Sequence, residues 1–404
     1  MKFRRKTLDS CLTVLFEGRD VGVTTMMLAV RYGSGDDGIE QKGMAHFIEH
    51  LCFKGTRKRT AKEIMSELEG FGGELNAGTH EDFTVYYVKF PSEHLGKAME
   101  VLFDVFFCPI FPKKEVERER SVILEEIKMY HDAPHARVLD KISEGLYAAP
   151  FGCSGLGRKE DVARFSGEEL KGRHSAIYVP SNVILSVVGN NDFDEVVRLA
   201  ERFVDDARRN VDMGEKVIGV DRPEIVKRHL KDSEKREGLH QANIALGLHF
   251  PTARDNDRYA AELFCSILGE GMSSRLFEEV REKRGLVYGV KSNVDMGPDH
   301  GSMIIWAGTS PDSVEEVREV CLEEVGKMGS LTQEELDSAK VRIKGFKKVE
   351  SENCGHVALD LVSEEISGKA EEYYEFEGRV DAVKLEDVRK LARFEDYAWY
   401  VLSS

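Results

Sequence analysis

The 404-residue sequence lacks long apolar runs. Its first apolar stretch, residues 11–16, covers only six positions before Glu17. A secretory signal contains an apolar segment of about 7–15 residues, and a membrane-spanning helix needs about 20. We therefore expect neither a signal peptide nor a membrane-embedded segment.

The sequence also has no closely paired cysteines and no excess of positive charge. Its seven cysteines are dispersed without a C-x-x-C pair, which predicts reduced thiols and a cytoplasmic location. The net charge of −16 argues against nonspecific nucleic-acid binding, and an acidic surface favours basic peptides as ligands. No Walker loop for nucleotide phosphates is present.

The chain is too long for one ordinary hydrophobic core, and two domains of about 200 residues fit the usual sizes. Its composition is globular, with 41% hydrophobic and 32% charged residues. Helical and strand patterns weaken between residues 206 and 223, which predicts a linker there. We therefore expect an N-terminal domain at residues 1–205 and a C-terminal domain at residues 224–404.

The most informative stretch reads H-x-x-E-H, at His46, Glu49 and His50. On a helix, the two histidines lie on one face, four residues apart, and can hold one metal ion from the same side. Glu49 precedes the second histidine, and its carboxylate can reach the side of the helix on which the metal ion would lie, where it would act as a general base. The pattern suggests a zinc-dependent hydrolase, although a short motif of this kind also occurs in ordinary helices.

A catalytic zinc ion needs a third protein ligand and one open position. Glu126 is the strongest candidate, in a segment at residues 114–131 that has no glycine or proline and is expected to be helical. Glu119 lies two turns earlier on the same face and could accept a hydrogen bond from a ligating histidine. Glu125 points about 100° away and is expected on a solvated face.

Two other candidate ligands fit the site less well. His131 and His135 also have a spacing of four residues, but Pro134 lies between them and should break the helix. We expect this pair in a surface turn. Cys52 lies on a different face of the helix from His50 and is expected to be packed rather than bound to metal.

The alternation of apolar and polar residues predicts an α+β fold, beginning with a β-hairpin at residues 12–16 and 24–32. Further helices are expected at residues 61–71, 95–107, 193–205, 275–284 and 385–392. Further strands are expected at residues 83–90, 182–189, 242–250, 288–296, 303–307 and 397–402. The second half repeats the layout loosely without a second H-x-x-E-H.

Residues 43–56 (GMAHFIEHLCFKGT) resemble the inverzincin signature of the pitrilysin-type zinc peptidases. The length resembles the short two-domain branch, which includes the beta subunit of mitochondrial processing peptidase. Further landmarks keep the family's order along most of the chain, at residues 72–77, 125–127, 178–182, 273–277 and 281–288.

The resemblance implies that His46, His50 and Glu126 bind one zinc ion per chain and that Glu49 activates water. It further implies that Asn76 and Ala77 lie on a sheet edge where a peptide is bound as an added strand. By the same resemblance, Arg281 and Tyr288 of the second domain approach the substrate. Arginine offers a planar donor fork for a carbonyl or carboxylate, and the tyrosine hydroxyl could stabilise an oxyanion.

The implied architecture is two homologous domains, each an antiparallel-rich sheet covered by helices, enclosing a cleft. We expect a zinc endopeptidase that hydrolyses short or unfolded peptides. Because one chain carries both the zinc motif and the Arg281–Tyr288 pair, a homodimer is the simpler assembly. The alternative is a noncatalytic or regulatory subunit of a heteromeric peptidase-like assembly.

Overall fold

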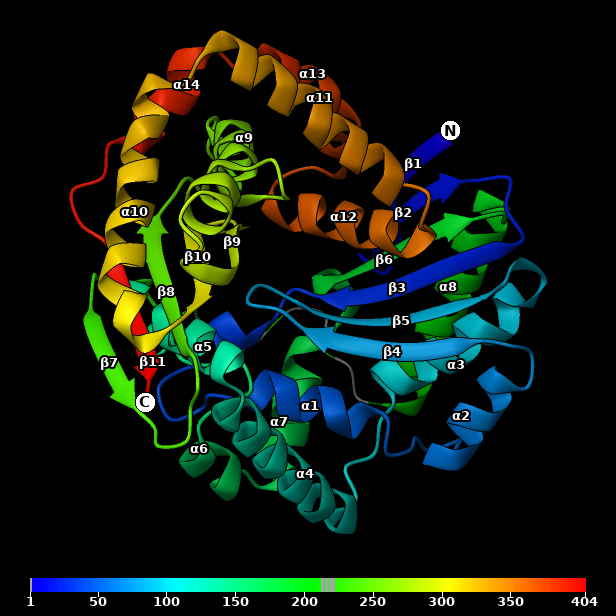
Figure 1. The fold of residues 1–404 in the computed structure, drawn as a ribbon. Coiled ribbons are helices and arrows are strands. Elements are labelled where there is room, and N and C mark those ends of the chain that lie inside the picture. Colours follow the sequence, from blue (N-terminus) through cyan, green and yellow to red (C-terminus); the bar gives the residue numbers. More distant parts are fainter. Residues whose placement is uncertain (1, 212–213, 215–216, 218–221) are drawn as a thin grey trace. The chain divides into compact units, whose positions relative to one another are not determined.

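The computed structural model describes residues 2–211, 214, 217 and 222–404, which fold into two compact units (Figure 1). Unit 1 comprises residues 1–127, 155–223 and 350–373. Unit 2 comprises residues 128–154, 224–349 and 374–404. Each unit is a mixed sheet with helices on both faces, so the fold is α+β, as expected from the sequence.

Unit 1 contains a six-stranded sheet in the order β1-β2-β6-β3-β5-β4, so that β4 is an edge strand (Figure 1). Only β2 and β6 run parallel, and the other neighbours are antiparallel. The strands are β1 (Lys2–Thr7), β2 (Thr13–Gly18), β3 (Val23–Val30), β4 (Glu74–Thr79), β5 (Thr84–Pro91) and β6 (Val183–Gly189).

The helices of unit 1 pack on both faces of this sheet. Strand β3 shows the consequence. Met26 and Leu28 enter the core beneath α3 (Leu95–Phe107) and α8 (Phe193–Asn210), while Met27 and Ala29 enter the core beneath α12 (Cys354–Ser367). A strand buried on both faces reads as a continuous apolar run. The helices are α1 (Met44–Cys52), α2 (Ala61–Glu69), α3 (Leu95–Phe107), α6 (Lys159–Arg164), α7 (Gly167–Ile177), α8 (Phe193–Asn210) and α12 (Cys354–Ser367).

Unit 2 contains a five-stranded sheet in the order β7-β11-β8-β10-β9. Its strands are β7 (Lys231–Lys235), β8 (Ala242–His249), β9 (Val287–Met296), β10 (Gly301–Thr309) and β11 (Ala398–Ser403). Its helices are α5 (Pro134–Leu146), α9 (Arg258–Gly269), α10 (Val314–Lys327), α11 (Gln333–Glu350), α13 (Phe376–Ala382) and α14 (Leu385–Arg389). Helix α4 (Lys113–Asp132) begins in unit 1 and its last residues belong to unit 2.

The two sheets share one topology. In each, a parallel pair (β2 with β6, β7 with β11) is followed by three antiparallel strands in equivalent order. Unit 1 adds β1 at its edge. This correspondence is what the two homologous domains implied by the resemblance would produce.

Each unit contains one helix that comes from the other half of the sequence. The domains expected at residues 1–205 and 224–404 were contiguous and did not allow for this. Helix α5, from the first half of the sequence, packs on β8 and β11 of unit 2. Helix α12, from the second half, packs on β6 and β3 of unit 1. An amphipathic helix requires an apolar surface to cover, but its own sequence does not specify which sheet provides that surface.

The expected linker at residues 206–223 also begins too early, because α8 continues to Asn210. The rest of that linker falls largely outside the described residues, at 212–213, 215–216 and 218–221.

The expected hairpin between residues 12–16 and 24–32 is wrong. Both segments form strands, β2 and β3, but β6 lies between them in the sheet. β2 forms a hairpin with β1 instead, and its other partner, β6, is more than 150 residues away in sequence, where a hairpin prediction does not look. None of the helices in the described part of the chain is both long and apolar enough to span a membrane.

Candidate metal centre

Helix α1 carries the H-x-x-E-H motif, and a buried carboxylate fixes its N-terminus. Asp37 accepts hydrogen bonds from the backbone N–H groups of Gly43 (2.9 Å), Met44 (3.1 Å) and Ala45 (3.2 Å). Burial raises the pKa of Asp37 to about 6, against the opposing effect of Lys42. The first turn of a helix leaves its N–H groups without intrahelical partners, and Asp37 supplies the missing acceptors.

Gly43 is required at the start of this helix. Its φ angle of 94° lies in the left-handed region, and a Cβ atom there would lie 2.8 Å from the Cα of Gly157. Both the backbone conformation and the close packing therefore exclude a larger residue.

Residues 33–38 (GSGDDG) follow β3 with the glycine spacing of a dinucleotide-binding loop. In such loops, a phosphate binds the free N–H groups at a helix N-terminus. Here the Asp37 carboxylate already accepts those hydrogen bonds at α1, and the preceding strand has antiparallel neighbours rather than a βαβ arrangement. This segment therefore anchors a helix and leaves no place for a phosphate.

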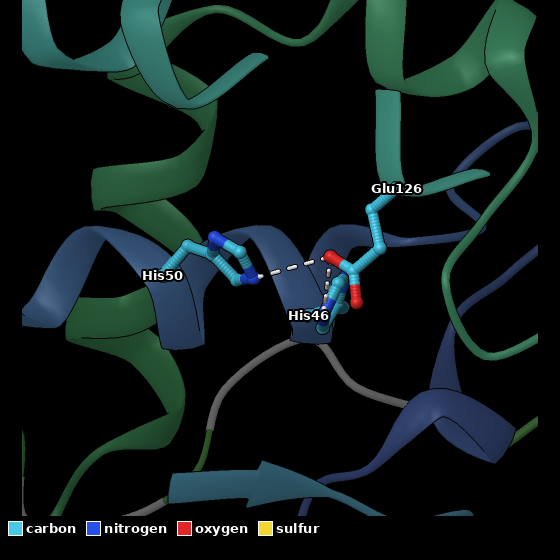
Figure 2. Close-up of side chains that lie close together, drawn as sticks. All are labelled: His46, His50 and Glu126. Atoms are coloured by element: carbon cyan, nitrogen blue, oxygen red, sulfur yellow. Dashed lines mark ion pairs between the residues drawn. The ribbon is translucent and has the colours of Figure 1, made fainter. Parts of the chain in front are cut away.

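His46 and His50 lie one turn apart on α1, and both point at the carboxylate of Glu126 on α4 (Figure 2). Their Nε2 atoms are 3.8 Å and 3.6 Å, respectively, from Glu126 Oε2. The structure thus brings together the three residues that the sequence proposed as ligands. One nitrogen from each ring and one carboxylate oxygen all lie within 4.8 Å of one another.

Glu119 orients the second histidine. Its Oε2 lies 3.2 Å from His50 Nδ1, and its Oε1 forms an ion pair of 2.9 Å with Lys54. Burial alone would raise the pKa of Glu119, but the hydrogen bonds to His50 and Lys54 outweigh this effect and lower it. An ionised Glu119 holds the ring proton of His50 on Nδ1, which leaves the Nε2 lone pair directed at Glu126.

The donor set fits a zinc ion. Two imidazole nitrogens and one carboxylate oxygen are the protein ligands of several catalytic zinc sites, which keep a fourth position open. Burial, together with the nearby His50, lowers the pKa of His46 to about 3, so the ring stays in the neutral form that binds metal. Its Nδ1 is buried and has no hydrogen-bond partner among the described residues.

Glu49 is held beside the ligand set by strand β4. The Thr79 hydroxyl donates a hydrogen bond of 2.5 Å to Glu49 Oε2. Burial raises the pKa of Glu49, while the bond from Thr79 acts in the opposite direction. A carboxylate with a raised pKa is better suited to accept and return a proton near neutral pH than an ordinary surface glutamate.

Asn76 and Ala77 lie on β4, the edge strand of the unit 1 sheet. Asn76 is exposed, and its Oδ1 accepts a hydrogen bond of 2.8 Å from the N–H of Ala77. Along this strand, Thr79 lies on the α1 side, and residues two positions apart share a face.

Arg281 and Tyr288 lie in unit 2. Arg281 belongs to η4 (Phe277–Glu282), a short π-helical segment within the expected helix at residues 275–284, and its guanidinium stacks over the Phe277 ring. Tyr288 lies on β9 and is 79% exposed. Both side chains are therefore accessible on the surface of unit 2.

The less favoured candidate ligands lie outside this centre. Cys52 is fully buried, burial raises its pKa to about 12, and it accepts a hydrogen bond from the Tyr86 hydroxyl. The helix breaks between His131 and His135 as predicted, but the expected surface turn is wrong, because α5 starts immediately at Pro134. Proline is favoured in the first turn of a helix, where its missing N–H has no cost.

Three side chains that support the centre were not identified from the sequence: Asp37, Lys54 and Thr79. Thr79 could have been found by strand alternation, since it lies two positions from Ala77. Lys54 follows His50 by four residues, but it lies beyond the end of α1. Asp37 gave no comparable signal, because its contact with α1 depends on the path of the intervening loop.

Models of known protein families match both halves of the chain. Residues 14–156 match the insulinase family, peptidase family M16, and residues 164–342 match the peptidase M16 inactive domain. A Bacillus subtilis protein named "Uncharacterized zinc protease YmxG" is 32% identical, with 99% of this chain and 98% of the relative covered. A Rickettsia felis protein named "Uncharacterized zinc protease" is 33% identical over 85% of this chain and 82% of its own length.

Solved structures share the fold. A protease from Helicobacter pylori superposes with a TM-score of 0.92 at 24% identity, covering 100% of this chain and 99% of that one. A Pseudomonas fluorescens structure described as a peptidase M16 inactive domain gives a TM-score of 0.90 at 20% identity, covering 100% and 98%.

Proposed function

Because the chain belongs to the insulinase (M16) family of peptidases, we propose that it is a zinc-dependent endopeptidase that hydrolyses short or unfolded peptides. The observation that carries the proposal is the convergence of His46, His50 and Glu126 beside Glu49. A structural helix pair would not need two histidines and a carboxylate facing one point, with a further carboxylate held beside them.

The metal proposed for this centre is zinc, one ion per chain, bound by His46, His50 and Glu126. When bound, it supplies Lewis-acid polarisation of the scissile carbonyl and of an attacking water. Glu119 and Lys54 keep His50 oriented and in the correct tautomer.

Glu49 would carry the proton during the reaction. In our proposal it accepts a proton from the attacking water and later delivers it to the nitrogen of the leaving amine. The hydrogen bond from Thr79 fixes the carboxylate in position for both transfers. The hydroxyl of Tyr288 would stabilise the developing oxyanion, and Arg281 would bind a substrate carbonyl or carboxylate.

The substrate would bind as an added strand along β4, at Asn76 and Ala77. An edge strand offers main-chain donors and acceptors, which recognise extended peptides with few demands on side-chain identity. The Ala77 N–H donates to Asn76 Oδ1 in the structure, and with substrate bound it would donate to a substrate carbonyl instead. In a folded protein most extended segments are already paired within a sheet, so unfolded or short peptides are the proposed class.

The remaining proposals concern the charge of the substrates, the oligomeric state and the cellular location. The net charge of −16 favours basic peptides among its substrates. We propose a homodimer, because one chain carries both the ligand set and the Arg281–Tyr288 pair. None of the seven cysteines, each in the described part of the chain, is in a disulfide, and a reducing cytoplasm would keep them as thiols.

The test compares metal content and cleavage of a quenched basic peptide in the parent, in Glu49→Gln and in Glu125→Gln. Glu125 is an exposed carboxylate on α4 and serves as the matched control. The proposal predicts about one zinc per chain in all three proteins, and loss of cleavage only in Glu49→Gln. Equal cleavage by Glu49→Gln would refute the assigned base.

The alternative, a noncatalytic or regulatory subunit of a heteromeric assembly, predicts a different result. The purified parent would then bind zinc but cleave no peptide in a broad library. Failure of the parent to bind any metal would exclude the peptidase and the zinc-binding regulatory subunit, and would favour the noncatalytic subunit, a scaffold.

A further inference from the structure

Unit 1 contains a cavity of about 440 Å³ on the face of its sheet opposite α1. Helix α12 packs on β6 and β3 on this face (Figure 1), and Val85 of β5 belongs to the same buried cluster. The hollow beside the helix is lined by residues of β3, β4, β5 and α12, and we call it the α12 pocket. Its volume falls in the range of cavities that hold small-molecule ligands.

Strand β4 separates the α12 pocket from the candidate metal centre. On one face of the strand, Thr79 binds Glu49. Three residues of β4 line the pocket, Glu74, Ala77 and Gly78, and two of them, Glu74 and Gly78, lie on the face opposite Thr79 by the two-residue alternation of a strand. A peptide paired with the outer edge of β4 would show the same alternation, with successive side chains directed to the two faces in turn.

The chemistry of the pocket indicates which side chain it would take. Met27, Tyr87 and Leu359 form apolar walls from β3, β5 and α12. At one end, Glu74 lies directly across the strands from Lys89, so the opposite charges offset each other and favour no single ionic ligand.

The opposite end of the pocket is also without strong charge. The His80 ring stacks on Phe83, and burial lowers the pKa of His80, which keeps the ring neutral at physiological pH. A neutral, largely apolar hollow of this size suits a large apolar or aromatic side chain better than a lysine or arginine.

We propose that the α12 pocket is a specificity subsite that receives a large apolar or aromatic side chain of a peptide paired with β4. This inference rests on the proposed function, because the peptide must lie along β4 to reach the pocket. It assigns to α12, a helix from the second half of the sequence, a direct role in substrate selection by unit 1. Side chains at the neighbouring positions of the peptide would face the metal centre instead.

Two substitutions fill the pocket from opposite walls. Gly78→Val adds a side chain from β4, where a Cβ atom meets nothing nearer than His80 Nε2 at 3.9 Å. Leu359→Trp adds bulk from α12. Lys369→Trp places the same indole at an exposed position outside the pocket and serves as the control. Circular dichroism of each variant checks that the chain is folded. One correctly folded pocket variant is enough to test the proposal.

The experiment measures kcat/KM for a series of quenched peptides in which phenylalanine replaces alanine at one position at a time. The parent and Lys369→Trp should prefer phenylalanine by about tenfold or more at one position, with no such preference at the adjacent positions. Gly78→Val and Leu359→Trp should lose that preference. Cleavage by all proteins with an unchanged preference in both pocket variants would overturn the proposal.

A binding measurement distinguishes failure of the subsite from failure of the proposed function. If the parent cleaves none of the peptides, fluorescence anisotropy of the same labelled peptides measures binding alone. Tighter binding of the phenylalanine peptide by the parent, lost in Gly78→Val, would support the subsite without catalysis. Equal binding of the alanine and phenylalanine peptides by the parent would overturn it.

Discussion

His50 Nδ1 lies 3.2 Å from Glu119 Oε2, while Nε2 of the same ring lies 3.6 Å from Glu126 Oε2. Both carboxylates come from α4, two helical turns apart. One helix therefore supplies a carboxylate beside each nitrogen of the imidazole. Glu119 accepts a hydrogen bond from the proton on Nδ1, and Glu126 lies beside Nε2. The arrangement fixes ring orientation and tautomer before any metal binds.

Glu119→Gln should weaken zinc binding by about 10- to 100-fold, the usual effect of losing an outer partner of a ligating histidine. The amide can turn its N–H group toward His50 and has no charge to hold the ring proton. Competition with a chelating dye measures the affinity. Glu125→Gln, the same change at an exposed position on α4, should leave it unaltered, and an equal loss in both variants would contradict the assigned role.

Thr79→Val should lower kcat/KM about tenfold while zinc content stays the same. The change removes the hydroxyl that holds Glu49 but touches none of the three ligands. A hydrogen bond to a charged group contributes about 1.5–3 kcal/mol, and about 1.4 kcal/mol corresponds to a factor of ten in rate.

The control for this variant is Thr84→Val, at the residue paired with Thr79 across the two strands. Its hydroxyl donates to the backbone oxygen of Tyr32 instead of to Glu49. It should reduce stability without a selective loss of kcat/KM. Equal kinetic losses in the two valine variants would show that the effect comes from the sheet and not from Glu49.

The sequence predicted the ligand set better than it predicted the architecture around it. His46, Glu49 and His50 lie within five residues on one helix, so helical geometry alone places them together. The uninterrupted helical pattern around Glu126 allowed a second helix to be assigned. These contacts follow from local periodicity and from the resemblance to a known family.

Features that depend on distant pairing could not be obtained in this way. The insertion of β6 between β2 and β3 joins segments more than 150 residues apart. The exchange of α5 and α12 depends on which sheet each apolar face covers. The contact of Asp37 with α1 depends on a loop conformation that the residue types alone do not determine. Each is decided by tertiary packing, which outweighs local preference.

Asp37→Asn should lower the free energy of unfolding by about 1–3 kcal/mol, because the amide cannot accept all the hydrogen bonds that the carboxylate receives from the first-turn N–H groups of α1. Urea denaturation measures the change. Asp37→Asn also removes the charge that attracts the Lys42 ammonium, so the double variant Asp37→Asn with Lys42→Met should cost less than the sum of the two single changes. Purely additive costs in the double variant would argue against coupling of the two residues.

In unit 2, Glu234 on β7 joins three elements of the fold. It forms ion pairs with Arg137 of α5 (2.9 Å) and with Arg236 (2.6 Å), and it accepts a hydrogen bond from Tyr400 of β11 (2.9 Å). Partial burial would raise the pKa of Glu234, but hydrogen bonds from Arg236, Tyr400 and Arg137 outweigh that effect and lower it to about 2.

This lowered pKa predicts a defined dependence of stability on pH. A glutamate in the unfolded chain has a pKa of about 4.3, so the unfolded state binds the proton more readily. The stabilisation by Glu234 is then fully present above about pH 5 and is lost as the pH falls toward 2. Glu234→Gln should therefore cost about 2 kcal/mol at pH 7, measured by urea denaturation, and about half as much at pH 3. Because other carboxylates titrate equally in both proteins, the difference between parent and variant isolates Glu234. A gap between the two proteins that stays constant from pH 7 to pH 3 would show that the ion pairs with Arg137 and Arg236 contribute no net stability.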